Sequence, residues 1–207
     1  MATKKKQQLT SPIGTAIWPR LNSPDYRWKP ENGEYKVTLR LPRDEAAPFI
    51  AAIDEALERK YQQCLLEEKK KTLKRGALPY KPVVNDVTGE ETGEIDIKFS
   101  LLAKVKPKKG DPFEQRPALF DAALKPMSAI VGGGSRIRVS CLVHPWYTAL
   151  GVGVSLWLKA VQVLELVAPG NDATAYGFGV EDGFTAAEET AAVAGGKDAA
   201  GEDEEDF

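Results

Sequence analysis

Four segments of the chain alternate apolar and polar residues in the manner of strands. They run from Tyr35 to Leu41, from Ile95 to Leu101, from Arg136 to Val143 and from Leu150 to Val167. Because successive side chains of a strand point to opposite faces, each segment is predicted to bury one face and expose the other. Such segments must bury their apolar faces against one another, so a mainly β protein is expected.

Helical periodicity is confined to one stretch between the first two of these segments. It begins at Asp44, which suits a helix start, and continues to about Lys71. Its apolar residues recur three and four positions apart: Phe49, Ile50, Ile53, Leu57, Tyr61, Cys64 and Leu65. This pattern predicts one long amphipathic helix inserted between strands.

The last strand segment changes its inward parity near Lys159. The apolar residues that face inward are at even positions from Val152 to Leu158 and at odd positions at Val161 and Val163. The change predicts a β-bulge, a device that helps small barrels to close. Strands, one inserted helix and a bulged closing strand are typical of the OB fold, and we therefore predict an OB-fold-like five-stranded barrel.

The remaining segments complete the predicted organisation. Residues 1–15 are expected to form a flexible basic arm, residues 16–168 the barrel domain, and residues 169–207 a disordered acidic tail. Prolines and aromatic residues in the stretch 16–30 predict a structured loop or edge segment. Its rings Trp18, Tyr26 and Trp28 are expected either to stack on bases or to cover an open end of the barrel, and Trp18 is favoured for the core. Further loops are predicted at Leu78 to Val84 and, as a mobile basic loop, at Lys104 to Gly110.

Charge is divided unevenly between the body and the tail. From Pro169 to Phe207 there are eleven acidic residues and one basic residue, a net charge of −10, whereas residues 1–168 hold 27 basic and 19 acidic residues, a net charge of +8. The chain ends in five carboxylates and one aromatic ring: Glu202, Asp203, Glu204, Glu205, Asp206 and Phe207. A basic body favours a polyanionic partner, with which an attached acidic tail can compete. The alternative is a tail that serves only solubility, and the exposed terminal ring argues against it.

Cations of the predicted strands and of the basic loop point outward from the barrel. They are Lys36, Arg40, Lys98, Lys104, Lys106, Arg136, Arg138 and Lys159. Aromatic candidates for stacking on unpaired bases are Trp28, Tyr80, Phe113, Tyr147 and Trp157. The small residues Gly151, Gly153 and Ser155 are predicted to leave an open surface beside Trp157. A basic, partly aromatic strand face suits a single-stranded nucleic acid, because cations follow the phosphates and rings stack on bases.

Enzymatic chemistry has little support in the sequence. No motif fixes a carboxylate pair or a serine nucleophile, and the glycine-rich Gly132 to Ser135 lacks the ending of a phosphate loop. The single His144 and the distant Cys64 and Cys141 argue against a zinc site, so no cofactor or metal is expected. Two distant cysteines and the lack of a long apolar run predict reduced thiols in a cytoplasmic protein that does not span a membrane.

Several short motifs resemble those of the single-stranded DNA-binding proteins of tailed phages, of the T-odd coliphage type. The motifs are Pro24-Asp25, Gly33-Glu34-Tyr35-Lys36-Val37, Asp111-Pro112-Phe113, Arg116-Pro117-Ala118, Gly133-Gly134-Ser135-Arg136-Ile137-Arg138-Val139, Gly153-Val154-Ser155-Leu156 and Val161-Gln162-Val163, together with the Asp-Phe ending. The resemblance covers most of the stretch 16–167. It implies an OB fold, sequence-independent DNA binding, homodimers in some members, and tail contacts with DNA polymerase and helicase/primase. It also implies a role in phage DNA replication, recombination and repair, in the cytoplasm of the host cell.

Two other functions fit the same residues. An RNA-binding OB protein or RNA chaperone presents the same cations and rings, since nothing in the sequence marks a contact to a 2′-hydroxyl. A protein-interaction module whose basic face binds an acidic protein is the second alternative.

Overall fold

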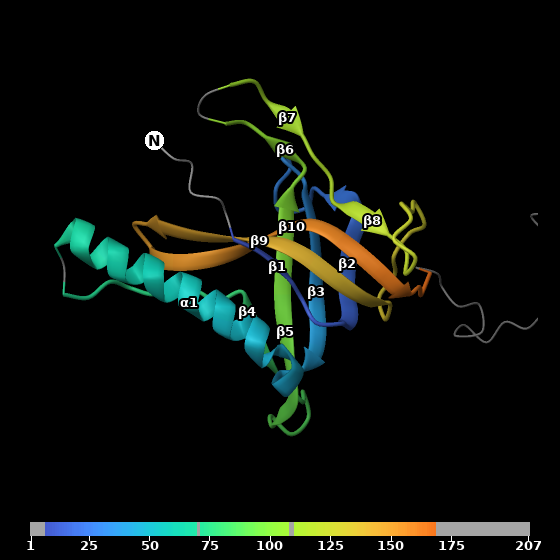
Figure 1. Cartoon of the computed structure of the whole chain (residues 1–207), viewed down its shortest axis with the longest axis horizontal. Helices are drawn as coiled ribbons and strands as arrows, with labels where there is room; N and C mark the ends of the chain where they lie inside the picture. Colours follow the sequence, from blue (N-terminus) through green and yellow to red (C-terminus); the bar gives the residue numbers. More distant parts are fainter. Residues whose placement is uncertain (1–6, 70, 108–109, 169–207) are drawn as a thin grey trace, which may run out of the picture. The chain divides into compact units, whose positions relative to one another are not determined.

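A computed structural model of the chain describes residues 7–69, 71–107 and 110–168 (Figure 1). Its elements, in chain order, are β1 (Gln8–Thr10), β2 (Gly14–Asp25), β3 (Glu34–Pro42), α1 (Arg43–Glu68), β4 (Tyr80–Val84), β5 (Glu91–Leu102), β6 (Lys104–Val105), β7 (Phe113–Glu114), β8 (Ala118–Phe120), β9 (Arg136–Thr148) and β10 (Gly151–Glu165). Residues 1–6 of the predicted basic arm and the whole predicted acidic tail lie outside the described residues.

Five of the strands pair in a closed circuit. β2 pairs with β3, β3 with β5, β5 with β10, β10 with β9, and β9 again with β2. The β5–β10 pairing is parallel and consists of one register pair, Ser100 with Trp157, whereas the other four pairings are antiparallel. This circuit, with one helix in the described part of the chain, confirms the predicted mainly β, OB-fold-like architecture.

The alternating segments become strands of this circuit, as predicted. In β3, the residues Tyr35, Val37, Leu39 and Leu41 are buried while the residues between them are half exposed. The predicted parity change in β10 is also confirmed, because its register against β9 shifts between Leu158 and Ala160. Lys159 is the extra residue, and it returns the next valines to the core.

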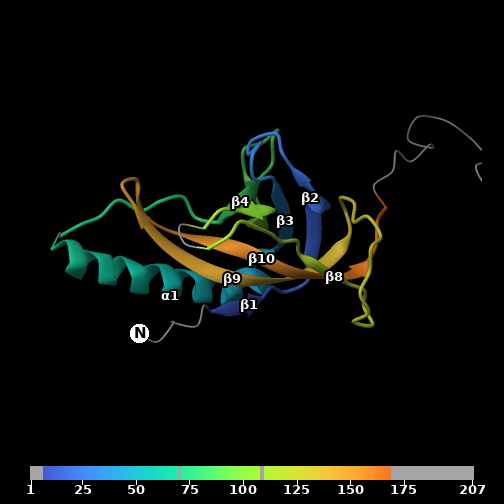
Figure 2. The same ribbon diagram turned by 90° about the horizontal axis from the view of Figure 1, so that it is seen from above.

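The predicted helix is confirmed as α1. Asp44 and Glu45 lie in its first turn, where the helix dipole favours negative charge, and it ends where Lys69 takes a left-handed conformation. Its buried side chains join the barrel core, and the ring of Phe49 lies 6.1 Å from that of Phe99 on β5. Figure 2 shows α1 running beside β9.

The proline-rich stretch at residues 16–30 was predicted wrongly in part. Residues up to Asp25 belong to β2, which accommodates its prolines by register shifts between Ile17 and Arg20 and between Arg20 and Asp25. Trp18 is not in the core, since it is 80% exposed with a φ of 47°. The prolines on which the sequence prediction depended are thus accommodated within a strand.

Five more short strands were not predicted from the sequence pattern: β1, β4, β6, β7 and β8, of which β6 begins the segment predicted as a mobile basic loop. Residues 80–84, predicted as a loop, form β4 on the edge of β5, and β1 adds a short strand to β9 within the stretch predicted as an arm.

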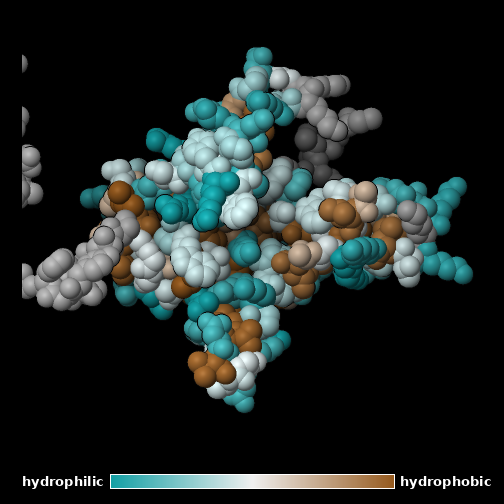
Figure 3. Space-filling view, turned by 180° about the vertical axis from the view of Figure 1, so that it is seen from behind, coloured by the Kyte–Doolittle hydropathy of each residue, from teal (hydrophilic) through white to brown (hydrophobic). Residues whose placement is uncertain are grey.

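On the face seen in Figure 3, hydrophobic residues appear in separate groups among hydrophilic ones.

Candidate nucleic-acid interface

One row of outward side chains crosses four neighbouring strands. The register pairs Arg20 on β2 with Lys36 on β3, Lys36 with Ser100 on β5, and Ser100 with Trp157 on β10. Lys98, two residues before Ser100, is exposed on the same face and pairs with Thr38. Since adjacent strands lie about 4.8 Å apart, the row spans about 14 Å along the sheet. The row brings together the predicted residues Lys36, Lys98 and Trp157, and it adds Arg20.

Trp157 is half-buried in a stack with His144. The two ring centroids lie 3.9 Å apart with an interplanar angle of 24°. His144 is on β9, where it pairs with Ser155. This pair is two residues along from the pair of Leu142 with Trp157 and therefore lies on the same face. The stack fixes the plane of the indole.

The surface beside Trp157 is less open than predicted. Gly151 and Gly153 are buried, because the backbone of Lys74 lies against Gly151 and Trp146 packs over Gly153. A Cβ atom on Gly153 would lie 2.1 Å from Cζ2 of Trp146, and the indole Nε1 of Trp146 donates a hydrogen bond of 3.0 Å to Oγ of Ser155. Gly153 therefore admits a tryptophan ring of the protein itself.

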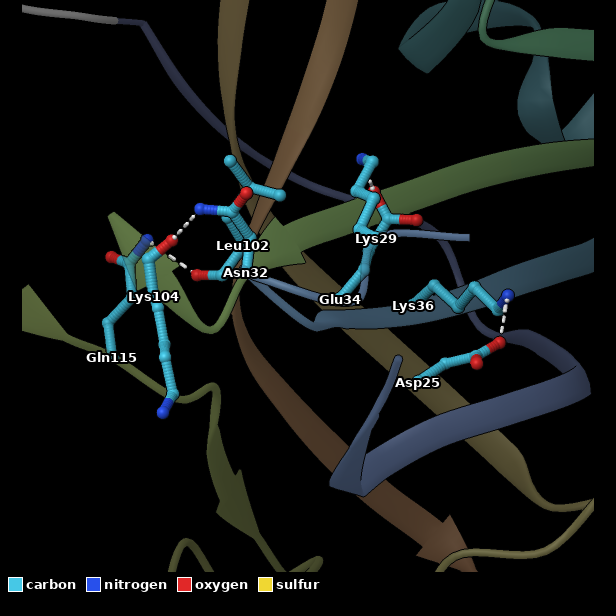
Figure 4. Close-up of polar contacts among 8 residues, drawn as sticks. All are labelled: Asp25, Lys29, Asn32, Glu34, Lys36, Leu102, Lys104 and Gln115. Carbon is cyan, nitrogen blue, oxygen red and sulfur yellow. Dashed lines mark hydrogen bonds and ion pairs between the residues drawn. The ribbon is translucent and has the colours of Figure 1, made fainter. Parts of the chain in front are cut away.

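Several of the predicted cations are held by carboxylates. Nζ of Lys36 lies 2.6 Å from Oδ2 of Asp25, and the two side chains point toward one another in Figure 4. The Lys36 bond, with the backbone N–H of Arg27 and the charges of Lys36 and Arg20, holds the pKa of Asp25 below its ordinary value of 3.8. The pair leaves the lysine about one third exposed, at 35%.

Arg40 forms a bidentate ion pair with Asp96 that is more buried than the pair of Lys36 with Asp25. Its Nε and Nη2 donate hydrogen bonds of 2.8 and 3.0 Å to the two carboxylate oxygens, and Asp96 is only 5% exposed. The bond to Asp96 raises the pKa of Arg40. Arg40 therefore stabilises the β3–β5 pair, a role that the sequence pattern did not predict.

The turn between β2 and β3 is joined to the β6–β7 hairpin. The backbone N–H of Lys104 donates to the carbonyl of Asn32 at 2.9 Å, and the side chain of Asn32 donates back to the carbonyl of Lys104 at 2.8 Å (Figure 4). The side chains of Lys104 and Lys106 lie 3.2 Å from Glu114 and 3.7 Å from Glu31 respectively.

Two predicted aromatic residues are presented by these connected loops. Trp28 is 77% exposed, with the guanidinium of Arg27 5.6 Å from its ring centroid. Phe113 is 49% exposed, on β7 opposite Val105. Trp28 lies in the turn before β3 and Phe113 on β7, so both rings belong to connected segments near the start of β3, where Lys36 lies.

Tyr80 and Tyr147 pack against the core. The hydroxyl of Tyr80 donates a 2.6 Å hydrogen bond to Asp54 on α1, and burial, together with this bond, raises the pKa of Tyr80. Tyr147 is half-buried and pairs with Val152. The structure therefore separates these two predicted residues from the row.

A second group of predicted cations lies at the start of β9. Arg136 and Arg138 are exposed and pair with Glu165 and Gln162 of β10. Arg136 also pairs with Thr15, which pairs in turn with Arg40. These pairings connect Arg136 and Arg138 to the row across β2, but the two arginines lie further along the strands than the pair of Arg20 with Lys36. Lys159 is exposed on β10, two residues beyond Trp157.

Sequence reasoning did not select Arg20 or His144 as part of the interface. Arg20 lies in a stretch that was not predicted as a strand, although its place near Trp18 and Pro19 could have indicated a binding residue.

In the described ranges, no group of three or more histidines, cysteines and acidic residues is arranged to hold a metal ion. No helix of the described chain is long and apolar enough to cross a membrane.

Comparison with known proteins adds the family. The model of the family described as single-stranded DNA-binding protein of bacteriophage T7 matches residues 14–166, which include every strand of the closed circuit. The chain belongs to this family.

Curated members of the family are similar over most of their length. A single-stranded DNA-binding protein of Enterobacteria phage T3 is 31% identical, covering 91% of this chain and 89% of its own, and that of Escherichia phage T7 is 28% identical, covering 92% and 87%. The crystal structure of gp2.5, a single-stranded DNA-binding protein encoded by bacteriophage T7, matches with a TM-score of 0.67 and 26% identity, covering 88% of this chain and all of that chain.

A more distant structure supports the fold alone. The single-stranded DNA-binding protein from bacteriophage Enc34, in complex with single-stranded DNA, has a TM-score of 0.56 at 16% identity, covering 81% of this chain and 96% of that chain. The family membership confirms the resemblance inferred from the short sequence motifs.

Proposed function

We propose that this protein binds single-stranded DNA without sequence preference and acts in phage DNA replication, with the strand lying on the outward face of β2, β3, β5 and β10. The observation that carries the proposal is the row in which Lys36, Lys98 and Trp157 share one face. Cations placed along a strand face neutralise phosphates, and a fixed indole accepts an unpaired base in a way that duplex DNA, with its bases paired, does not allow. Membership of the T7 family supports the same nucleic acid.

Binding exchanges carboxylates for phosphates at the row. Asp25 holds Lys36 in the free protein, and the pair is partly exposed, so an arriving phosphate can replace the carboxylate at small cost. Lys104 and Lys106 are paired in the same way with Glu114 and Glu31. The preformed pairs hold the lysine side chains in place before DNA arrives.

The remaining predicted residues fall into an extension of this face. Trp28 and Phe113 offer further rings on the loops at the Lys36 end, and Lys159 continues β10 beyond Trp157. Arg136 and Arg138 contact phosphates where the strand leaves the row around β2. The protein performs no catalysis in this proposal, and it coats exposed strands.

The acidic tail is proposed to recruit the replication machinery. Its last six residues, from Glu202 to Phe207, combine negative charge with one ring, which suits a partner pocket that is apolar and rimmed by cations. DNA polymerase and helicase/primase are the proposed partners, and formation of a homodimer remains a prediction.

The test is fluorescence anisotropy with a labelled oligothymidine, its duplex and an RNA of the same length. The full-length protein is expected to prefer the single DNA strand. Trp157→Ala is expected to weaken binding by roughly 5- to 150-fold, the range for loss of one base stack. Lys98→Gln is expected to reduce the slope of log affinity against log salt by about 0.7, the value for one phosphate on a single strand.

Lys60→Gln on α1 removes the same charge away from the row and is the matched control. Equal effects of Lys98→Gln and Lys60→Gln, or equal affinity for duplex and single strand, would refute the proposed face.

A further inference from the structure

Trp18 exposes a large aromatic ring that the fold does not use. It is 80% exposed, whereas Ala16 and Leu21, its neighbours along β2, are buried at 0% and 3%. A tryptophan that served the core would bury most of its ring, as Trp146 does over Gly153. The ring therefore needs an explanation outside the packing of the barrel.

The backbone at Trp18 holds the ring outward against local steric preference. Its φ of 47° lies in the left-handed region, which bulky side chains rarely adopt. The register between β2 and β3 shifts between Ile17 and Arg20, so that Trp18 and Pro19 leave the ladder as a bulge. Bulges and strained residues concentrate at binding sites, where they aim a side chain.

The bulge places Trp18 beside the cation end of the row. Arg20 follows two residues later, is exposed, and pairs with Lys36. The charge of Arg20 reaches Asp25, where it helps to hold the pKa of that carboxylate down. Arg20 and Lys36 pair across β2 and β3, and both lower the pKa of the single carboxylate of Asp25, so two cations face one carboxylate between Trp18 and the next ring.

We propose that Trp18 is a second base-stacking platform, and that one strand of DNA crosses the row with bases on Trp18 and Trp157 and phosphate on Arg20 and Lys36. The proposal rests on the single-stranded DNA binding proposed above and deepens it by fixing the path of the strand. A nucleotide is favoured over an apolar protein surface because it satisfies both the ring and the adjacent cations.

The test uses full-length protein with Trp18→Ala, Trp18→Phe and Trp18→Gly. Trp18→Ala is expected to weaken binding to oligothymidine by roughly 5- to 150-fold, and Trp18→Phe to retain most of the affinity because a ring remains. None of the three is expected to lower the melting temperature, and Trp18→Gly is expected to raise it, since glycine adopts a positive φ without strain. Leu150→Ala removes an exposed apolar side chain outside the row, at 75% exposure, and is the control.

The outcomes separate this inference from the proposed function. If wild-type protein binds and Trp157→Ala weakens binding while Trp18→Ala does not, the second platform is refuted and the binding face stands. If wild-type protein fails to bind single-stranded DNA, the proposed function itself fails. A change of oligomeric state in Trp18→Ala by sedimentation, with unchanged DNA affinity, would show that the ring contacts another protein chain and would overturn the proposal.

Discussion

Replacing Arg40 by alanine distinguishes a cation that stabilises the barrel from one that serves DNA. The substitution removes both hydrogen bonds to Asp96, of 2.8 and 3.0 Å, and leaves a carboxylate of a residue that is 5% exposed without its cation. Breaking a buried pair costs about 3–5 kcal/mol and an exposed one under about 1 kcal/mol. Because the Arg40 side chain is 31% exposed, water can reach part of the site. We therefore expect the free energy of unfolding to fall by about 2–3 kcal/mol.

Urea denaturation followed by tryptophan fluorescence measures this loss. Arg40→Lys is expected to lie between wild type and Arg40→Ala, because lysine keeps the charge without the planar fork. The double variant Arg40→Ala with Asp96→Ala is expected to be more stable than Arg40→Ala alone, since no orphaned carboxylate remains. A loss within about 0.5 kcal/mol for Arg40→Ala, as for an ordinary surface residue, would refute the reasoning. DNA affinity is then measured on the folded fraction, where Arg40→Ala is expected to lose less than Lys98→Gln.

Further predictions concern Asp25, Gly153 and Cys141. Asp25→Asn frees Lys36 from its carboxylate, so the variant is expected to bind DNA more tightly. The slope of log affinity against log salt is expected to steepen by about 0.7. Fluorescence anisotropy measures both quantities, and Glu55→Gln on α1 is the control. Because the pKa of Asp25 is lowered in the folded protein, its contribution to stability is present above pH 3.8 and is lost as pH falls below it, which an acid titration of wild type and Asp25→Asn compares. Gly153→Ala is expected to cost about 1–3 kcal/mol by displacing Trp146, and a melting temperature equal to that of wild type would contradict the observed packing. Burial raises the pKa of Cys141 to about 12, so in the native protein its thiol is expected to resist alkylation at pH 8–9, as followed by mass spectrometry. Its contribution to stability is expected to fall as pH rises above 9, as followed by denaturation.

The sequence by itself determined the strands that alternate without interruption, the helix, and the bulge at Lys159. Each is a local pattern in which the burial of a residue depends on its own place in a regular repeat. The same regularity placed Lys36 and Lys98 on the outward face, and the short motifs identified the family.

Tertiary structure decided which outward residues share a surface and which are engaged elsewhere. Trp18 was placed in the core although a bulge turns it outward, and the hydrogen bond of Tyr80 could not be predicted because its partner Asp54 lies on α1, 26 residues away. The row itself depends on register between strands, which pairs Ser100 with Trp157 and so joins β5 to β10. Register is set by how the barrel closes, and closure is a property of all five strands together, which no single segment of the sequence carries.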